Sequence, residues 1–250
     1  MAPIREPVLR DVERLRLRRM VVNGTCEADW PEVRSLAQDH PMVFPCFGVH
    51  PWHVSTLSSR WRKTLLQCLD LGPCGVGEIG LDRWVKDYDL PLQEEVFTWQ
   101  MRVASERNLP VTIHCLKAWG RLHEMLRRGP RPARGFLLHS YGGPEEMIQP
   151  LADLGAYFSM SGYFAHARKA RQCAAFRSVP IDRLLIETDA PDMGPPAVWN
   201  DFPLTDERTG TAINHPGNIG AVHRFVAQLL DRPIEVLALR VEENFKHLFE

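Results

Sequence analysis

The stretch Val76-Gly77-Glu78-Ile79-Gly80-Leu81-Asp82 is an apolar run that carries a carboxylate, Glu78, at a point where a buried strand would end. Three further apolar runs end in polar residues of the same kind, at His114, His139 and Asp189. In a parallel barrel the carboxyl ends of the strands meet on one face, which carries the chemistry. Two imidazoles and two carboxylates on successive strand ends can therefore converge on one metal ion.

Short apolar runs alternate with longer amphipathic stretches along the whole chain, which predicts right-handed crossovers and a parallel sheet. The seven expected strands are 20–22, 43–49, 74–78, 111–114, 136–139, 156–160 and 184–188. The expected helices are about 8–19, 31–40, 60–71, 91–107, 118–128, 144–154, 164–177, 217–230 and 233–247. Seven such units nearly complete a TIM-type (β/α)8 barrel, so we predict a single barrel domain over residues 1–250.

The composition excludes several classes of protein. The 250 residues carry a formal net charge of -1, so no global basic field attracts nucleic acid, and a phosphate contact must be local or made by a metal. Six cysteines without a C-x-x-C pattern indicate reduced thiols. No secretory segment and no apolar run near 18 residues is found. We therefore expect a cytoplasmic protein without a membrane partner.

The residue types at the four strand ends suit a divalent metal ion. A mixed nitrogen and oxygen set favours Zn, Mn or Fe, while Mg, which prefers oxygen ligands, is possible. Glu78 can bridge two ions, and Asp189 can bind metal and also orient or deprotonate the attacking water. We expect the metal ligands to be Glu78, His114, His139 and Asp189, with Asp189 and Glu78 as the catalytic residues.

The ordered motifs of the chain resemble the TatD family of metal-dependent hydrolases, within the amidohydrolase-like barrel superfamily. The resemblance runs from about residue 8 to the end. The matching segments are Phe47-Gly48-Val49-His50-Pro51, Gly77-Glu78-Ile79-Gly80-Leu81-Asp82, Pro110-Val111-Thr112-Ile113-His114-Cys115, Leu138-His139-Ser140, Glu187-Thr188-Asp189-Ala190-Pro191, Asn214-His215-Pro216-Gly217-Asn218 and 244–249.

This resemblance implies a barrel that binds two divalent ions and hydrolyses phosphodiesters, chiefly at DNA 3′ ends. Carried over to this chain, Glu78 bridges both ions, His114 and His139 complete the shell of one ion, and Asp189 holds the other and handles the water. The resemblance also places His50 and Asp82 on the substrate side. The implied partner is a DNA end or a small phosphodiester substrate.

The chain departs from the family pattern at two places. The family begins with a strand that ends in His-x-His, whereas here Met1-Ala2-Pro3-Ile4 leads into what resembles the first helix, so we expect the first strand to be missing. An upstream Asp-x-His-x-His segment would restore it. Leu116-Lys117-Ala118 stands where many members carry an Arg and an Asp, so Lys117 is the expected substitute for a phosphate contact.

Two consequences follow from the missing strand. One ion keeps Glu78, His114 and His139 and is held tightly, whereas the second ion site, left with Glu78 and Asp189, is weakened. The barrel has a gap between strands 20–22 and 184–188, and such unpaired edges can pair two copies into a homo-oligomer. Residues 1–7 are not expected to fill the gap as a regular strand, because Pro3 and Pro7 interrupt it.

Other readings of the chain stay open. The absent His-x-His pair allows a catalytically impaired, one-metal or metal-free protein with a scaffold or binding role. A carbon–nitrogen or ester hydrolase of the wider superfamily is a third reading, although no lysine suited to bridging metals ends a strand. His50 and His53 are weak substitutes for the missing pair, because a loop rarely holds ligand geometry. Trp52, Trp84 and Trp119 either stack on a base or pack under loops.

Overall fold

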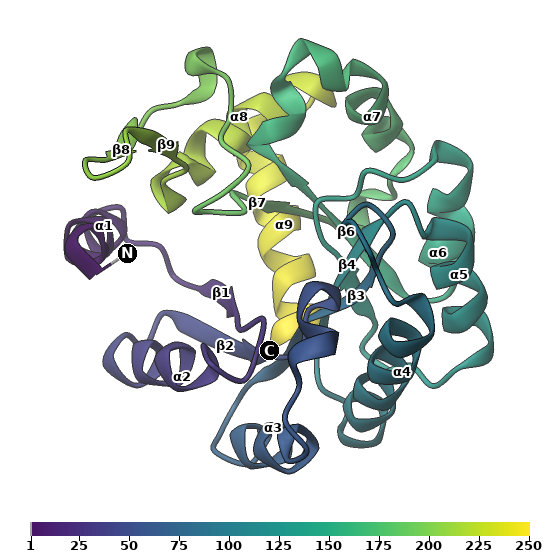
Figure 1. Cartoon of the computed structure of the whole chain (residues 1–250). Coiled ribbons are helices and arrows are strands. Elements are labelled where there is room, and N and C mark those ends of the chain that lie inside the picture. Colours follow the sequence, from purple (N-terminus) through teal and green to yellow (C-terminus); the bar gives the residue numbers. More distant parts are fainter. Residues whose placement is uncertain (1) are drawn as a thin grey trace.

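The protein is a curled parallel sheet surrounded by helices, as seen in a computed structural model that describes residues 2–250. The sheet has seven strands in the order β1 to β7, all parallel to their neighbours. Figure 1 shows the strands arranged around a centre with helices on the outside. The strands are β1 (Met20–Asn23), β2 (Val43–Phe47), β3 (Gly75–Asp82), β4 (Val111–Leu116), β5 (Phe136–Leu138), β6 (Ala156–Ser161) and β7 (Leu184–Glu187). This is the TIM-type barrel fold that the sequence predicts.

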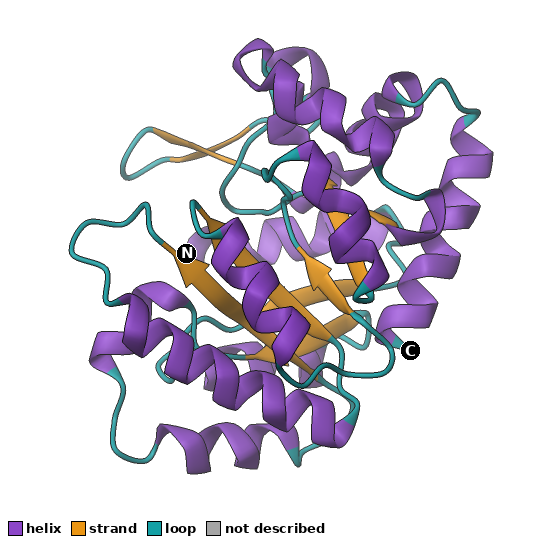
Figure 2. Ribbon diagram, turned by 90° about the vertical axis from the view of Figure 1, so that its right-hand side faces the viewer, coloured by secondary structure: helices purple, strands orange, loops and turns teal. Residues whose placement is uncertain are grey.

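The helices form the outer layer, which Figure 2 shows around the sheet from the side. They are α1 (Ala2–Arg14), α2 (Trp30–Asp39), α3 (Trp61–Leu69), α4 (Leu90–Arg107), α5 (Trp119–Arg128), α6 (Ile148–Asp153), α7 (Ala170–Ala175), α8 (Ile219–Leu229) and α9 (Ile234–Phe249). Within residues 2–250, none of these helices has both the length and the apolar character needed to cross a bilayer.

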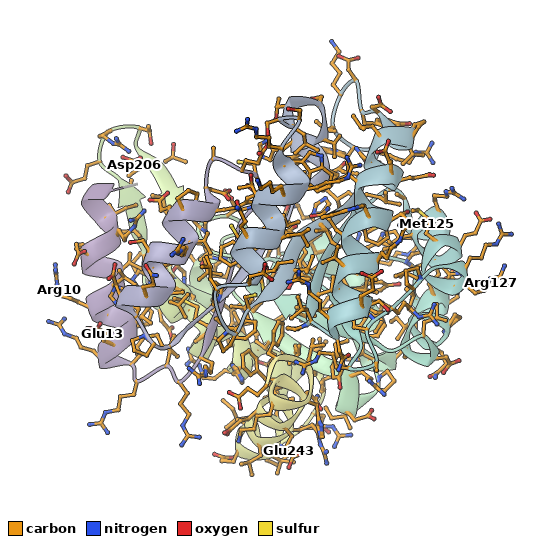
Figure 3. The ribbon with its side chains drawn as sticks, turned by 90° about the horizontal axis from the view of Figure 1, so that it is seen from below. Arg10, Glu13, Met125, Arg127, Asp206 and Glu243 are labelled. Atoms are coloured by element: carbon orange, nitrogen blue, oxygen red, sulfur yellow. The ribbon has the colours of Figure 1, made fainter. Side chains whose placement is uncertain are left out.

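One continuous core lies between the sheet and the outer helices. Its fully buried members include Phe136 and Phe158 on strands and Leu65, Leu122 and Met101 on helices. Charged side chains such as those labelled in Figure 3, Arg10, Glu13, Arg127 and Glu243, project from the outer surface. The periodic apolar face of each helix is thus turned to the sheet.

The sheet does not close, because β1 and β7 are not paired with each other. Helix α1 lies across this seam (Figure 1). It forms an ion pair with α2 through Arg5 and Glu32, and on the other side of the seam Oδ2 of Asp11 lies 3.7 Å from Nε2 of His215. Within the described residues a helix, rather than a strand, therefore occupies this region, in agreement with the expectation from Pro3 and Pro7.

Helix α9 joins the two ends of the sheet at its amino-terminal side. The Asn244 side chain donates to the carbonyl groups of Ile181 and Leu184, at the start of β7. At the last residue of the helix, the ring of Phe249 packs edge to face against that of Phe44 on β2, with centroids 5.7 Å apart. The seam is thus covered by side-chain packing from two helices.

Several expected element boundaries are corrected by the structure. Helix α1 begins earlier than 8–19 and ends at Arg14, and strand 74–78 extends to Asp82. The expected helix 164–177 is mostly short 3-10 turns, with α-helix over Ala170–Ala175. An antiparallel hairpin, β8 (Leu204–Asp206) and β9 (Thr211–Ile213), was not expected, because its strands are only three residues long.

Glu78 lies in the middle of β3 and not at its end, which corrects the expected position. The pairing of β3 with β4 shifts register between Val76 and Ile79, and such an irregularity redirects the side chain that it carries. Gly77 and Gly80 flank the shift at places where no larger residue fits. A Cβ at Gly77 would lie 2.7 Å from Oδ1 of Asn23, and one at Gly80 would lie 1.9 Å from the His114 carbonyl oxygen. The glycines of the opening motif thus bring β3 against its neighbours.

Candidate metal centre

One carboxylate oxygen lies at the centre of the candidate site. Oε1 of Glu78 is 2.7 Å from Nε2 of His139, 3.2 Å from Nδ1 of His114 and 3.4 Å from Nε2 of His50. The Glu78 side chain is 13% exposed and the three imidazoles are 12% exposed or less. The structure therefore brings together three of the four expected ligands and adds His50, which follows β2.

Asp82 contacts His114 on the side of the imidazole that is turned away from Glu78. Its Oδ2 lies 2.9 Å from Nε2 of His114 and also accepts a hydrogen bond of 2.7 Å from the Trp52 indole N–H. Its Oδ1 accepts the backbone N–H groups of Trp84 and Val85. Because an ionised carboxylate only accepts, Nε2 of His114 carries a hydrogen toward Asp82, and Nδ1 is the nitrogen that faces Glu78.

Asp82, which the family resemblance places on the substrate side, is buried in the structure. The residue has no exposed surface, and both carboxylate oxygens already have partners. Its side chain contacts His114 and Trp52, which lie beside Glu78 and His50. Asp82 is four residues after Glu78 on β3, and this even spacing was the available signal that the two carboxylates share a face.

Glu187 is a site residue to which the sequence analysis gave no role. Its Oε2 accepts a hydrogen bond of 2.6 Å from the Ser159 hydroxyl, while its buried Oε1 has no hydrogen-bond partner and lies 3.7 Å from Nδ1 of His139. Glu187 thus lies on the side of His139 that is turned away from Glu78, as Asp82 does for His114, but at a longer distance. Its spacing of two residues from Asp189 could have indicated a shared face.

His50 is oriented by its own loop. Its Nδ1 accepts the backbone N–H of Trp52 at 3.2 Å, so Nε2 carries the hydrogen and points it at Glu78. His50 is 6% exposed, which leaves little surface for a substrate. The ring of His53 lies 6.4 Å from that of His50, and no contact between His53 and Glu78 is found among the described residues.

Asp189 lies at the outer part of the site, whereas Lys117 lies on the surface after β4. Oδ1 of Asp189 lies 3.8 Å from Nδ1 of His139, and its side chain is 29% exposed, more than those of Glu78 and Glu187. Asp189 directly follows the last strand of the sheet, as expected, and is linked to Glu78 through His139. Lys117 is exposed just after β4, and no side-chain contact of it is found among the described residues.

The donors form two groups that fit a divalent ion. His50, Glu78 and His114 place donor atoms within 4.8 Å of one another, as do His139, Glu187 and Asp189. Bonds of about 2.0–2.2 Å in a tetrahedral shell separate ligand atoms by roughly 3.3 Å, close to the distances around Glu78. The unpartnered oxygen of Glu187 is further evidence that this polar interior is built around a cation.

Mutual charge sets the protonation of the cluster. Burial works to raise the pKa of Glu78, but the charge of His139 and hydrogen bonds from the three imidazoles hold it well below the usual value. Burial works to lower the pKa of His139, but Glu78 raises it well above the usual value. Burial also raises the pKa of Asp189 to about 7, while hydrogen bonds from His114 and the Trp84 amide offset burial and hold that of Asp82 at about 2.

A parallel barrel with imidazoles and carboxylates gathered at the carboxyl ends of its strands defines a metal-dependent hydrolase. The comparison with protein families names the group. The chain belongs to the TatD related DNase family, which it matches over residues 2–250.

The similarity to related proteins extends over most of the chain. It is 28% identical to the 3′-5′ ssDNA/RNA exonuclease TatD of Escherichia fergusonii over 234 residues, covering 92% of this chain and 86% of the relative. It is 28% identical to the uncharacterized metal-dependent hydrolase YabD of Bacillus subtilis, covering 98% and 92%. The crystal structure of the TatD homolog YjjV from Escherichia coli superposes with a TM-score of 0.83 at 26% identity, covering 93% and 86%.

Proposed function

We propose that this protein hydrolyses single-stranded nucleic acid, DNA in particular, from the 3′ end. The observation that carries the proposal is the position of Asp189, the most exposed carboxylate of the cluster, beside His139 at the open end of the sheet. A phosphodiester entering from solvent meets this carboxylate first. The relative named as a 3′-5′ ssDNA/RNA exonuclease supports the choice of substrate.

The ligand roles follow from the tautomers of the two imidazoles. Oδ2 of Asp82 accepts a hydrogen bond from Nε2 of His114, and Oε1 of Glu187 lies 3.7 Å from Nδ1 of His139, so that Nδ1 of His114 and Nε2 of His139 face Glu78. Glu78, His114 and His139 then hold one ion, with Asp189 toward a second, weaker position. Zn, Mn or Fe suits this donor set better than Mg.

A divalent ion bound there would lower the pKa of water and neutralise charge on a phosphoryl oxygen. The protein's own residues position the attacking water and remove its proton. Oδ1 of Asp189 accepts the proton of the attacking water as its oxygen bonds to phosphorus, the bond from phosphorus to the 3′ oxygen of the preceding nucleotide breaks, and that oxygen takes a proton from solvent. Lys117, exposed after β4, contacts a neighbouring phosphate.

The test is hydrolysis of a 5′-labelled single-stranded oligonucleotide in the presence of Mn²⁺. Wild-type protein is expected to shorten it stepwise from the 3′ end. Asp189→Asn is expected to reduce kcat by roughly 100-fold or more, the usual contribution of a general base, and Asp192→Asn, an exposed neighbour three residues on, serves as the matched control.

The alternatives give different results. Bound metal without turnover of any oligonucleotide supports a scaffold or binding role and overturns the proposal. Hydrolysis of a carboxylic ester or amide, with none of the oligonucleotide, identifies a hydrolase of another bond. Internal cleavage, with no preference for the 3′ end, contradicts the exonuclease assignment but keeps the phosphodiesterase.

A further inference from the structure

Exposed aromatic side chains lie in the segments that follow the strands of the candidate metal centre. Three aromatic residues are among the large hydrophobic side chains exposed within the described chain, namely Trp52 (49%), Trp84 (61%) and Tyr88 (39%). All three lie in the segments that follow β2 and β3, at the carboxyl ends of those strands. Because tryptophan is buried in most of its occurrences, two exposed indoles at one end of the barrel indicate a binding surface.

Trp52 is the member of this group that is held rigidly next to the metal ligands. Its indole N–H donates to Oδ2 of Asp82 at 2.7 Å, and its backbone N–H donates to Nδ1 of His50 at 3.2 Å. The centroid of the indole lies 5.0 Å from that of His50 and 6.4 Å from that of His114. The ring is therefore anchored at its edge while half of its surface stays open to solvent.

From this geometry we propose that Trp52 is the stacking surface for the 3′-terminal base of the substrate. The inference rests on the proposed function, because it is the scissile phosphate at the metal centre that brings a base to this ring. A flat, preorganised indole suits a flat nucleobase, whatever its identity, since every base has a π-face. Trp119, by contrast, is partly buried and packs against Tyr141 with ring centroids 4.6 Å apart.

This surface favours an unpaired end of the nucleic acid. Bases within a duplex are already stacked on both sides, whereas the last base of a single strand has a free face. Arg83 and Lys86, exposed in the loop after β3, supply positive charge for the adjoining phosphates. The tightly held Trp52 is thus expected to bind a terminal nucleotide without regard to sequence.

The experiment compares two single-stranded oligonucleotides that differ only in the 3′-terminal nucleotide, thymidine in one and an abasic sugar in the other. Both carry a 5′ fluorescein and a terminal phosphorothioate link that resists cleavage. Binding to the Mn²⁺-loaded protein is measured by fluorescence anisotropy for wild type, Trp52→Ala and Trp52→Phe, with metal content checked for each. Unmodified versions of both strands give the hydrolysis rates.

For wild type, loss of the terminal base is expected to weaken binding by about tenfold, within the range that stacking on one aromatic ring contributes. In Trp52→Ala the thymidine strand should bind about tenfold more weakly, and removal of its base should have no further effect. Trp52→Phe keeps a ring but loses the hydrogen bond to Asp82, so it should retain most of the preference for the base.

Three results overturn the inference. The first is an equal abasic penalty in wild type and Trp52→Ala, and the second is a penalty that disappears in Trp84→Ala instead. The third is a Trp52→Phe variant as defective as Trp52→Ala, which would place the effect in Asp82 and not in stacking. Base-dependent binding without hydrolysis supports the stacking surface and rejects the nuclease, so the two proposals fail separately.

Discussion

Nε2 of His139 lies 2.7 Å from Oε1 of Glu78, which ties the end of β5 to the irregular middle of β3. Without a metal this is a charged pair, because mutual attraction outweighs burial and keeps the pKa of Glu78 low and that of His139 high. A divalent ion can use the same nitrogen only after the proton leaves. Metal loading and proton release are therefore coupled at this contact.

The charge of Glu78 is expected to be indispensable for metal binding. Glu78→Gln keeps the side-chain length but neutralises the oxygen that faces three imidazoles, so the affinity for Mn²⁺ or Zn²⁺ should fall by more than about 100-fold, beyond the usual effect of an outer partner. Isothermal titration calorimetry and elemental analysis measure this loss. Glu95→Gln, an exposed change on α4, is the control, and unchanged metal content in Glu78→Gln would reject the site.

A substitution at Asp82 tests whether this residue orients a metal ligand or contacts the substrate. In Asp82→Asn the amide cannot accept from His114 and Trp52 as the carboxylate does, so metal affinity should fall about 10–100-fold. At saturating metal the KM for an oligonucleotide should be close to that of wild type. A raised KM with unchanged metal affinity would restore the substrate role, and Asp87→Asn on the exposed loop serves as control.

Glu187 is expected to strengthen a single metal site and not to create a second. Because its Oε1 faces Nδ1 of His139, Glu187→Gln should weaken the first bound ion by about tenfold while a glutamine oxygen retains part of the contact. Glu187→Ala should weaken it further. A drop in stoichiometry from two ions to one, with the first ion unaffected, would instead identify Glu187 as a ligand of a second ion.

His139 and Asp189 should lower the stability of the metal-free protein as pH rises from 6 to 8, whereas His50, His215 and His223, whose pKa values are lowered, act with the opposite sign and mainly below pH 6.5. The folded pKa of His139 lies above its usual 6.5, so its stabilisation is complete below pH 6.5 and is lost as pH rises through the raised value. Asp189, raised from 3.8 to about 7, has the same sign, because the folded state binds its proton more tightly. The depressed pKa of Glu78 affects only acid conditions, below its usual 4.5.

Metal binding should reverse this trend, because the ligands must lose their protons. The rise in Tm produced by saturating Mn²⁺ over EDTA is therefore expected to be larger at pH 8 than at pH 6. Thermal unfolding followed by circular dichroism at both pH values measures it. A Tm of the metal-free protein that increases over this interval would contradict the assignment of the buried pair.

The fold was predictable from the sequence because strands such as 111–114 and 136–139 are short apolar runs bounded by clear breaks. The predicted element boundaries were wrong where tertiary contacts outweighed the local sequence pattern. The strand containing Glu78 continues past a register shift to Asp82, since contacts with β4 and not propensity extend it. The hairpin formed by β8 and β9 has too few residues to show any periodicity.

The expected contact of His114 and His139 with Glu78 follows from strand order, since parallel neighbours end on one face. The roles of Asp82 and Glu187 do not follow in the same way. They depend on which imidazole nitrogen each carboxylate faces, and that is set by side-chain rotation and burial. Likewise, the sequence places Trp52 after β2 but does not reveal that Asp82 holds its ring edge.

The seam under α1 has a further consequence for how this protein opens. Elsewhere in the sheet, separating two strands breaks a backbone ladder, but β1 and β7 share none. Their separation requires only that α1 and the end of α9 release a few side-chain contacts, such as the one between Phe44 and Phe249. Among the strands of the sheet, backbone hydrogen exchange should therefore be fastest in β1 and β7, which border the seam. Opening of the seam is expected to be the first sub-global unfolding event, and it gives a denaturant access to the core.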